Sequence, residues 1–216
     1  MIINILAGGP QELLPNLAEY NQNGCLWIGV DRGVFTLIQR GIQPHIAFGD
    51  FDSVSQEELR EIEAKVSKLC RFKPEKDETD MELALNWALD QEADRIQLFG
   101  ATGGRLDHFF ANVQLLTKPV LSGISKEVFM IDRSNIVFLK GPGKHSLKKN
   151  SRYHYVSFVP VGGAVEGLTL DGFKYPLNDC HIPLGSTLCI SNELISNCGT
   201  FSFSEGILLV IRSSDS

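Results

Sequence analysis

Two aspartates separated by one residue, Asp50 and Asp52, follow the apolar run Ile46–Phe48 and Gly49. If the backbone stays extended past the glycine, the two-residue period of a strand turns both carboxylates to the same side. Two carboxylates so placed repel each other unless a cation or a shared proton lies between them. Mg²⁺ prefers oxygen ligands and keeps part of its water shell, so it fits such a pair. The alternative is a solvated turn, because Asp, Gly and the following Ser53 are common turn residues.

The segments around this pair predict alternating strands and helices in the first half of the chain. Strands are expected at Ile2–Leu6, Leu26–Val30, Ile46–Phe48, Leu69–Phe72 and Arg95–Phe99. Apolar residues at helical spacing lie at Val34–Ile38, Leu59–Leu69, Met81–Ala88 and Leu106–Leu116. Ser55 with Glu58, and Thr79 with Glu82, could form capping boxes at helix starts. The alternation indicates an α/β domain with a mainly parallel sheet covered on both faces.

Short β-type runs separated by Gly, Asn, Asp and Pro follow beyond about residue 122. They lie at Glu127–Ile131, Ile136–Leu139, Tyr153–Val159, Ala164–Leu170, Thr187–Ser191, Thr200–Phe203 and Gly206–Ile211. Many short strands at this spacing suggest an antiparallel sandwich or a barrel-like domain. The expected domains are therefore an α/β domain at residues 1–122 and an all-β domain at residues 123–216.

Composition excludes several classes of partner. The chain has 216 residues, 43% of them hydrophobic, and a net charge of -6, which argues against a nucleic-acid surface rich in Lys and Arg. No apolar run approaches the roughly 20 residues that cross a bilayer, and the first residues lack the basic region of a signal peptide. The five cysteines are scattered, as reduced thiols commonly are. We expect a cytoplasmic protein that binds neither nucleic acid nor a membrane.

The polar clusters of the first half follow the expected strands. They are Gly8-Gly9, Asp31-Arg32-Gly33, Asp50–Ser53, Lys76–Asp80 and Thr102–His108. In an open parallel sheet, ligands bind beyond the carboxyl ends of the strands. The clusters therefore predict a binding site at one rim of the first domain.

The glycines of the last cluster suit phosphate binding. Thr102, Gly103 and Gly104 precede a helix, and backbone N–H groups at a helix N-terminus bind phosphate oxygens. Arg105 could add a bidentate contact. The cluster is neither a Walker A loop nor GxGxxG, and the alternative is a plain turn between a strand and a helix.

The carboxylates at this rim allow two interpretations each. Asp77, Asp80 and Asp107 lie near helix starts, where the helix dipole alone favours a negative charge. Asp31 could cap the next helix or hold a ribose hydroxyl. His108 is expected to be a packing or hydrogen-bonding residue. Several carboxylates, one arginine and glycine turns together suit a Mg²⁺-bound nucleoside triphosphate.

In order and spacing, these motifs resemble the thiamine pyrophosphokinase family over nearly the whole chain. The motifs are Asp31-Arg32-Gly33, Gly49–Ser53, Asp77–Asp80 and Gly103–His108, followed by Gly141–His145, Pro160–Gly162, Gly172–Leu177 and Ser191–Glu193. The resemblance implies an N-terminal α/β domain and a C-terminal β-sandwich, assembled as a homodimer. It also implies transfer of the pyrophosphoryl group of ATP to the hydroxyl of thiamine, which gives thiamine diphosphate and AMP.

The resemblance further implies roles for individual residues. Asp50, Asp52 and Asp80 would hold Mg²⁺ with ATP as co-substrate, and the catalytic group would be Asp52, Asp80, Arg105 and Asp107. From the chemistry of the residues, Asp107 is the first candidate among the aspartates for accepting the hydroxyl proton, and solvent or a substrate phosphate could serve instead. Substrate contacts would come from Asp31, Asp50, Ser53, Asp77, Thr79, Thr102, Gly103, Gly104 and His108, and from Ser191 and Asn192 near the thiamine.

Two other functions fit clustered carboxylates. A Mg²⁺-dependent phosphohydrolase would release inorganic phosphate without an acceptor, and a nucleotide-sensing module would bind ATP without turnover. AMP that forms only when thiamine is present separates the kinase from both. The number of carboxylates exceeds what ATP binding requires, which argues against the sensing module.

Overall fold

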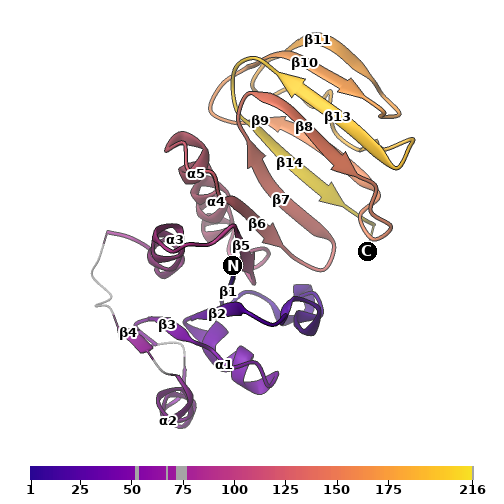
Figure 1. The fold of residues 1–216 in the computed structure, drawn as a ribbon. Coiled ribbons are helices and arrows are strands. Elements are labelled where there is room, and N and C mark those ends of the chain that lie inside the picture. The colour runs from indigo at the N-terminus through magenta and orange to yellow at the C-terminus, as the bar shows by residue number, and fades with distance from the viewer. Residues whose placement is uncertain (52–53, 67, 72–76, 216) are drawn as a thin grey trace. The chain divides into compact units, whose positions relative to one another are not determined.

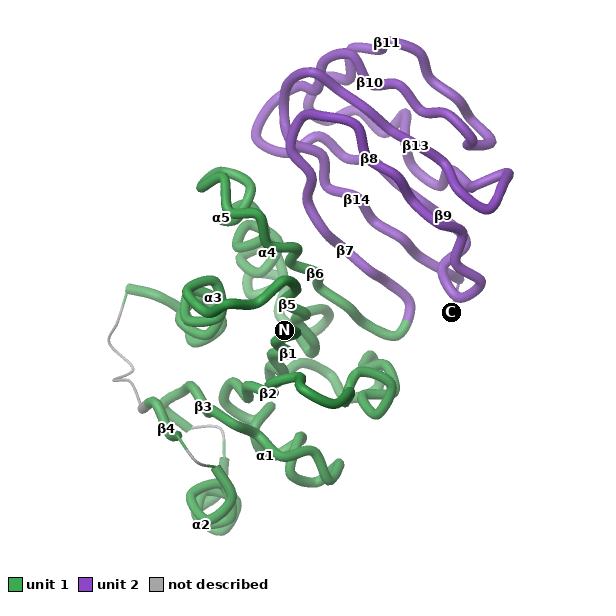
Figure 2. Tube along the Cα trace, viewed as in Figure 1, with its two compact units in different colours: residues 1–133 green, residues 134–216 purple. Residues whose placement is uncertain are grey.

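The chain forms two compact units, Met1–Arg133 and Ser134–Ser216, which Figure 2 shows in green and purple. The computed structural model describes residues 1–51, 54–66, 68–71 and 77–215. Two residues expected at the site, Asp52 and Ser53, therefore lie outside the described residues.

Unit 1 is built on a parallel sheet. Its described strands, in spatial order, are β6 (Glu127–Ile131), β5 (Arg95–Phe99), β1 (Ile2–Leu6), β2 (Cys25–Val30), β3 (Ile46–Gly49) and β4 (Lys68–Arg71). Each neighbouring pair is parallel. Ile3, Ile5 and Ile96 are fully buried, as expected for strands covered on both faces. The expected α/β domain is confirmed.

Helices cover both faces of this sheet. The α-helices are α1 (Arg32–Gln39), α2 (Gln56–Lys65), α3 (Asp80–Asp90), α4 (Leu106–Leu115) and α5 (Thr117–Leu121), and two 3-10 turns lie at Gln11–Leu13 and Leu17–Tyr20. Figure 1 shows α1 and α2 on one side of the strands and α3 on the other. None of the helices in the described ranges is long and apolar enough to span a membrane.

The helix boundaries follow local signals. Ser55 and Glu58 form the expected capping box of α2, and the Thr79 side chain accepts a hydrogen bond from the backbone N–H of Glu82 at the start of α3. Gly41, with φ +70°, follows the end of α1. The helical spacing extended too far to Leu69, because α2 ends at Lys65 and Leu69 lies in β4.

Unit 2 consists of two antiparallel sheets. One contains β12 (Asn192–Glu193), β9 (Tyr155–Pro160), β14 (Leu208–Ser213) and β7 (Asn135–Lys140); the other contains β11 (Leu177–Ile182), β10 (Val165–Asp171), β13 (Cys198–Phe203) and β8 (Gly143–Lys148). The ring of Phe158 lies 5.0 Å from Phe201 and 5.5 Å from Phe173, so aromatic contacts join the two sheets. The all-β sandwich is confirmed.

Three sequence expectations in the second half were incomplete or wrong. The expected strand Thr187–Ser191 is a run of turns and bends that ends at Ser191 with φ +57°. The strands β8 and β11 were missed, because they are edge strands with mostly exposed side chains and so lack an apolar pattern.

The division between the units falls after Arg133, later than the boundary expected after residue 122. The strand β6 explains the difference. It pairs in parallel with β5, so it completes the sheet of unit 1, although its sequence resembles the short strands of unit 2. A pairing between distant segments decided the boundary, and a pattern of local runs does not report such a pairing.

Candidate functional site

A cleft of about 690 Å³ lies within unit 1, beyond the carboxyl ends of β1, β2 and β5. It is lined by the turns after these strands, by the residues that lead into α3, and by one face of α4. The structure thus brings together Asp31, Asp77, Thr79, Asp80, Gly103, Gly104, Arg105 and His108 of the expected site. His108 is exposed and lines the cleft, so of the two expected roles, packing and hydrogen bonding, the packing role does not fit.

Other expected residues lie elsewhere. Asp50, Thr102 and Asp107 are described by the structure and do not line the cleft. Ser191 and Asn192 belong to unit 2. The cleft is therefore lined by the glycines after β5 and by the residues that lead into α3. Asp50 does not line it, although it follows Gly49, whose backbone lies against the cleft residue Asp31.

Two glycine turns that line the cleft, at Gly9 and at Gly100, contact each other closely. The N–H of Gly9 donates to the carbonyl of Gly100 at 3.0 Å. A Cβ atom on Gly9 would lie 2.4 Å from the Gly100 oxygen, and one on Gly100 would lie 2.4 Å from the Ala7 oxygen. Gly100 also has φ +61°. Only glycine fits this close approach, which brings the turns after β1 and β5 together at the cleft.

Asp31 lies where β2 ends. Its φ of +49° places it in a conformation uncommon for residues other than glycine, and its side chain makes no capping hydrogen bond to α1. A Cβ atom on Gly49 would meet Asp31 Oδ1 at 2.1 Å, so the carboxylate lies against the backbone just before Asp50. The capping role considered from the sequence is therefore not observed. Unusual backbone conformations cluster at ligand sites, which supports a binding role.

The backbone does not stay extended past Gly49. Gly49 has φ +148° and Phe51 has φ +60°, so the chain turns at Phe51. Phe51 is buried in a cluster with Val34, Ile38 and Ile62 of α1 and α2. The alignment of Asp50 with Asp52 by the strand period is therefore not supported. Burial of Phe51 in this cluster fixes the backbone directly after Asp50.

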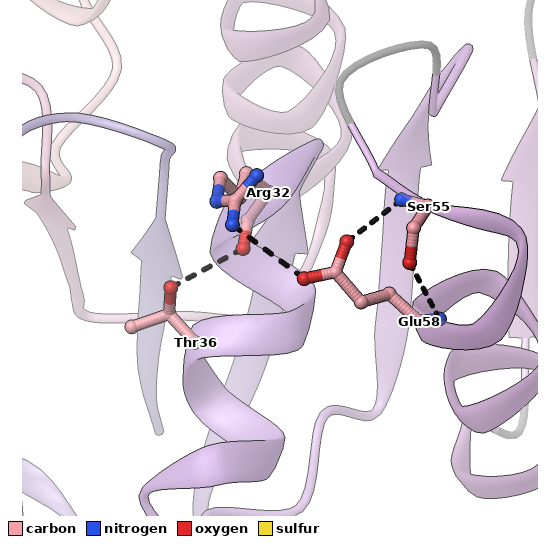
Figure 3. Close-up of polar contacts among 4 residues, drawn as sticks. All are labelled: Arg32, Thr36, Ser55 and Glu58. Carbon is pink, nitrogen blue, oxygen red and sulfur yellow. Dashed lines mark hydrogen bonds and ion pairs between the residues drawn. The ribbon is translucent and has the colours of Figure 1, made fainter.

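The helix α2 contacts Arg32 of α1, a residue of the cleft. Glu58 accepts a hydrogen bond from the Ser55 N–H at 2.7 Å and donates its own N–H to Ser55 Oγ at 3.2 Å, as Figure 3 shows. Its other carboxylate oxygen lies 3.5 Å from an Arg32 nitrogen. Arg32 lines the cleft. The Glu58 side chain thus contacts both the N-cap residue of α2, Ser55, and the guanidinium of Arg32.

Arg105 and Asp107 form a bidentate ion pair at the start of α4. Arg105 Nε lies 3.1 Å from Asp107 Oδ1, and the second pair of atoms is 2.6 Å apart. The hydrogen bond from Arg105, with a second from the His108 N–H, lowers the pKa of Asp107 to about 2. A carboxylate with such a low pKa is a poor proton acceptor near neutral pH. The low pKa of Asp107 argues against the general-base role first expected for it, and its two hydrogen bonds orient Arg105.

We predict that the Asp107 carboxyl titrates near pH 2 in the native protein, because Arg105 stabilises its charged form. Replacing Arg105 with alanine should raise this pKa toward about 3.9, its ordinary value. Carboxyl-carbon NMR during acid titration measures both. A native midpoint in the ordinary range would show that the pair does not form in solution.

In unit 2, Ser191 and Asn192 have different surroundings. Ser191 is exposed, and its N–H donates to Ser157 Oγ at 2.9 Å. Asn192 is buried, and its amide exchanges hydrogen bonds with both backbone groups of Tyr175 at 3.0 and 2.8 Å. Asn192 thus holds the segment around Tyr175, while Ser191 presents its side chain to solvent.

The cleft contains carboxylate oxygens, which are the kind of ligand that a hard cation such as Mg²⁺ prefers. Among the described residues, no three His, Cys, Asp or Glu side chains gather closely enough to hold a metal ion. Mg²⁺, however, is usually bound through one or two carboxylates, with water and substrate phosphates as the other ligands. Asp80 lines the cleft and offers such a carboxylate. The residues present therefore fit Mg²⁺ that arrives with a triphosphate.

Sequence reasoning missed several residues that line the cleft. Met81, Phe109 and Asn112 lie within the expected helices, and Gly100 directly follows the expected strand Arg95–Phe99. An asparagine in the middle of the expected helix Leu106–Leu116 is the signal that the sequence offered, because asparagine is a weak helix former.

A parallel sheet with an acidic, glycine-lined cleft at its carboxyl edge defines a nucleotide-binding class of α/β domain. Comparison with known proteins refines this class. The profile described as "Thiamin pyrophosphokinase, catalytic domain" matches residues 17–128, and "Thiamin pyrophosphokinase, vitamin B1 binding domain" matches residues 144–208. A thiamine pyrophosphokinase from Bacillus subtilis is 53% identical over 213 residues, which cover 99% of each chain.

Solved structures agree. The crystal structure of thiamine pyrophosphokinase from Bacillus subtilis has a TM-score of 0.95 at 50% identity and covers 100% of both chains. That of thiamin pyrophosphokinase from Geobacillus thermodenitrificans has a TM-score of 0.89 at 52% identity and covers 100% of this chain and 99% of its own. The chain belongs to the thiamine pyrophosphokinase family.

Proposed function

We propose that the cleft of unit 1 binds the triphosphate of ATP and that unit 2 contributes to the thiamine site. As a thiamine pyrophosphokinase, the chain transfers the pyrophosphoryl group of ATP to the hydroxyl of thiamine and yields thiamine diphosphate and AMP. The proposal for the cleft depends on one observation above all: the paired glycine turns, Arg105 and Asp80 line a single cavity. This set supplies donors for phosphate oxygens and an oxygen ligand for a cation.

The residues of the cleft suit this chemistry. Attack by an alcohol on a phosphoryl group needs positioning and neutralisation of charge more than covalent help from the protein. Gly103, Gly104 and Arg105 would contact the phosphates, with Asp107 orienting the arginine. Asp50, Asp52 and Asp80 would hold Mg²⁺, which would neutralise charge on the phosphate oxygens when bound. Asp31, Asp77 and Thr79 would contact the nucleotide or the cation.

The reaction is tested by incubating the protein with ATP and Mg²⁺, with and without thiamine. We expect AMP and thiamine diphosphate in equal amounts, and only when thiamine is present. Inorganic phosphate released without thiamine would favour a phosphohydrolase. ATP binding without any AMP would favour a nucleotide sensor.

In unit 2, we propose that Ser191 contacts thiamine while Asn192 positions the segment beside it. The exposed Ser191 hydroxyl and its positive φ support this assignment, as does the buried amide of Asn192. We predict that Ser191→Ala raises the KM for thiamine about tenfold, equivalent to one hydrogen bond, with little change in the KM for ATP. Steady-state kinetics with each substrate varied measures this, and Ser186→Ala in the preceding loop is the control. A change confined to ATP would remove Ser191 from the thiamine site.

We also propose a homodimer, because unit 2 exposes several large apolar side chains. They are Tyr175, Leu184, Leu188, Ile190 and Ile195. Apolar surface of this kind commonly marks an interface between proteins. Sedimentation of the native protein tests the dimer directly.

All five cysteines are free thiols, which supports a reducing compartment such as the cytoplasm.

A further inference from the structure

Asn112 is a buried polar residue in the middle of α4. Its exposed fraction is 9%, and it lines the cleft of unit 1. Asparagine is a weak helix former, because its amide competes with the backbone for hydrogen bonds. A buried amide is retained where it satisfies a specific partner. The position therefore points to a contact outside the helix.

That partner is the turn between β5 and α4. Asn112 Nδ2 donates to the Ala101 carbonyl at 3.0 Å, and the contact is buried. Ala101 is 5% exposed, so its carbonyl would be buried without a partner if the amide were lost. Such a group is costly, and the turn would have to move to reach water.

The turn has few other anchors from side chains. Thr102 Oγ1 is buried and makes no hydrogen bond within the described part of the chain. The contact from Gly9 to Gly100 fixes only the first residue of the turn. The hydrogen bond from Asn112 thus fixes the next residue, Ala101, from the α4 side. Gly103, Gly104 and Arg105 follow directly and line the cleft.

We propose that Asn112 is a positioning residue for ATP, which it serves by holding this turn in the conformation that meets the triphosphate. The inference rests on the proposed nucleotide role of the cleft. Since the turn belongs to unit 1 and the Ser191 segment to unit 2, loss of the contact should weaken ATP binding more than thiamine binding.

The test is Asn112→Asp, which keeps the shape of the side chain and makes its donor depend on pH. When protonated, the introduced carboxyl can donate to the Ala101 carbonyl; when ionised, it has no proton and places a negative charge beside a carbonyl oxygen. Burial raises the pKa of such a group, so the change should fall between about pH 5.5 and pH 8.5. The ratio of the variant's KM for ATP to the native KM should be near one at the acidic end and rise about 10- to 100-fold at the alkaline end.

Two controls separate positioning from folding. Asn86→Asp makes the same change in α3, where the side chain accepts a hydrogen bond from Lys118 at 2.8 Å, and its ratio should not vary with pH. Asn112→Ala has no donor at any pH, so its KM for ATP should be raised by a constant factor while its KM for thiamine stays near native. This variant also serves if the aspartate variant does not fold.

Calorimetry measures the affinity for ATP directly, and so compares the Asn112 variants with the native protein without relying on turnover. If the native protein makes no AMP with thiamine, the proposed function fails, while the calorimetric ratio still tests the role of Asn112. A pH-independent ratio for Asn112→Asp, or an equal rise in both KM values for Asn112→Ala, would overturn the inference.

Discussion

Replacing Asp80 with asparagine is expected to lower kcat about 10²- to 10³-fold, the usual loss for one electrostatic contact in an active site. Asp80 is the first residue of α3 and lines the cleft. Asparagine keeps the shape of the side chain but removes the charge that a cation would need. If the carboxylate helps to hold Mg²⁺, raising the Mg²⁺ concentration should restore part of the activity.

The stability of the variant should change little. A charge at a helix N-terminus contributes about 0.3–1 kcal/mol, and Glu82 remains in the same turn. The matched control is Asp90→Asn at the other end of α3, which is exposed and should retain native kcat. Thermal melts and steady-state kinetics at several Mg²⁺ concentrations provide the comparison. Near-native turnover in Asp80→Asn would place the cation elsewhere.

Arg105→Ala should produce a comparable loss of kcat/KM, about 10²- to 10³-fold. Arg105 lines the cleft, and Asp107 holds its guanidinium. Its removal would take a cation from the phosphate site and leave the Asp107 carboxylate without its partner, so charge repulsion adds to the lost contact.

Substitution with lysine separates charge from geometry. Arg105→Lys keeps the positive charge but cannot form two parallel hydrogen bonds with phosphate or with Asp107. We expect it to recover only part of the activity. The control is Arg95→Lys, at the start of β5, where the side chain pairs with Glu127 outside the cleft. Equal activity of native protein and Arg105→Ala would contradict the phosphate role.

The sequence predicted correctly those features that are formed by residues close together in the chain. The capping box of Ser55 and Glu58 involves residues three apart, and it forms as the sequence predicts. The central strands β2 and β3 are continuous apolar runs, as expected for a sheet that helices cover on both faces. The glycine turns after β1 and β5 converge because parallel strands deliver their ends to one edge.

The features that the sequence did not predict depend on contacts between residues that are far apart in the chain or on the conformation of a neighbouring side chain. The turn at Phe51 follows from burial of its ring among residues of α1 and α2, which the sequence around Asp50 does not reveal. The low pKa of Asp107 requires the side-chain conformation of Arg105. The role of Asn112 depends on the position of Ala101 in the folded chain.

The central claim is that the triphosphate of ATP lies in the cleft of unit 1. The most direct measurement is a crystal structure with a nonhydrolysable ATP analogue, Mg²⁺ and thiamine. We predict phosphate oxygens at the backbone of Gly103 and Gly104 and at Arg105, with the metal ion bound to Asp80. A triphosphate bound away from these residues, or a metal ion without an aspartate ligand from this cleft, would contradict the account.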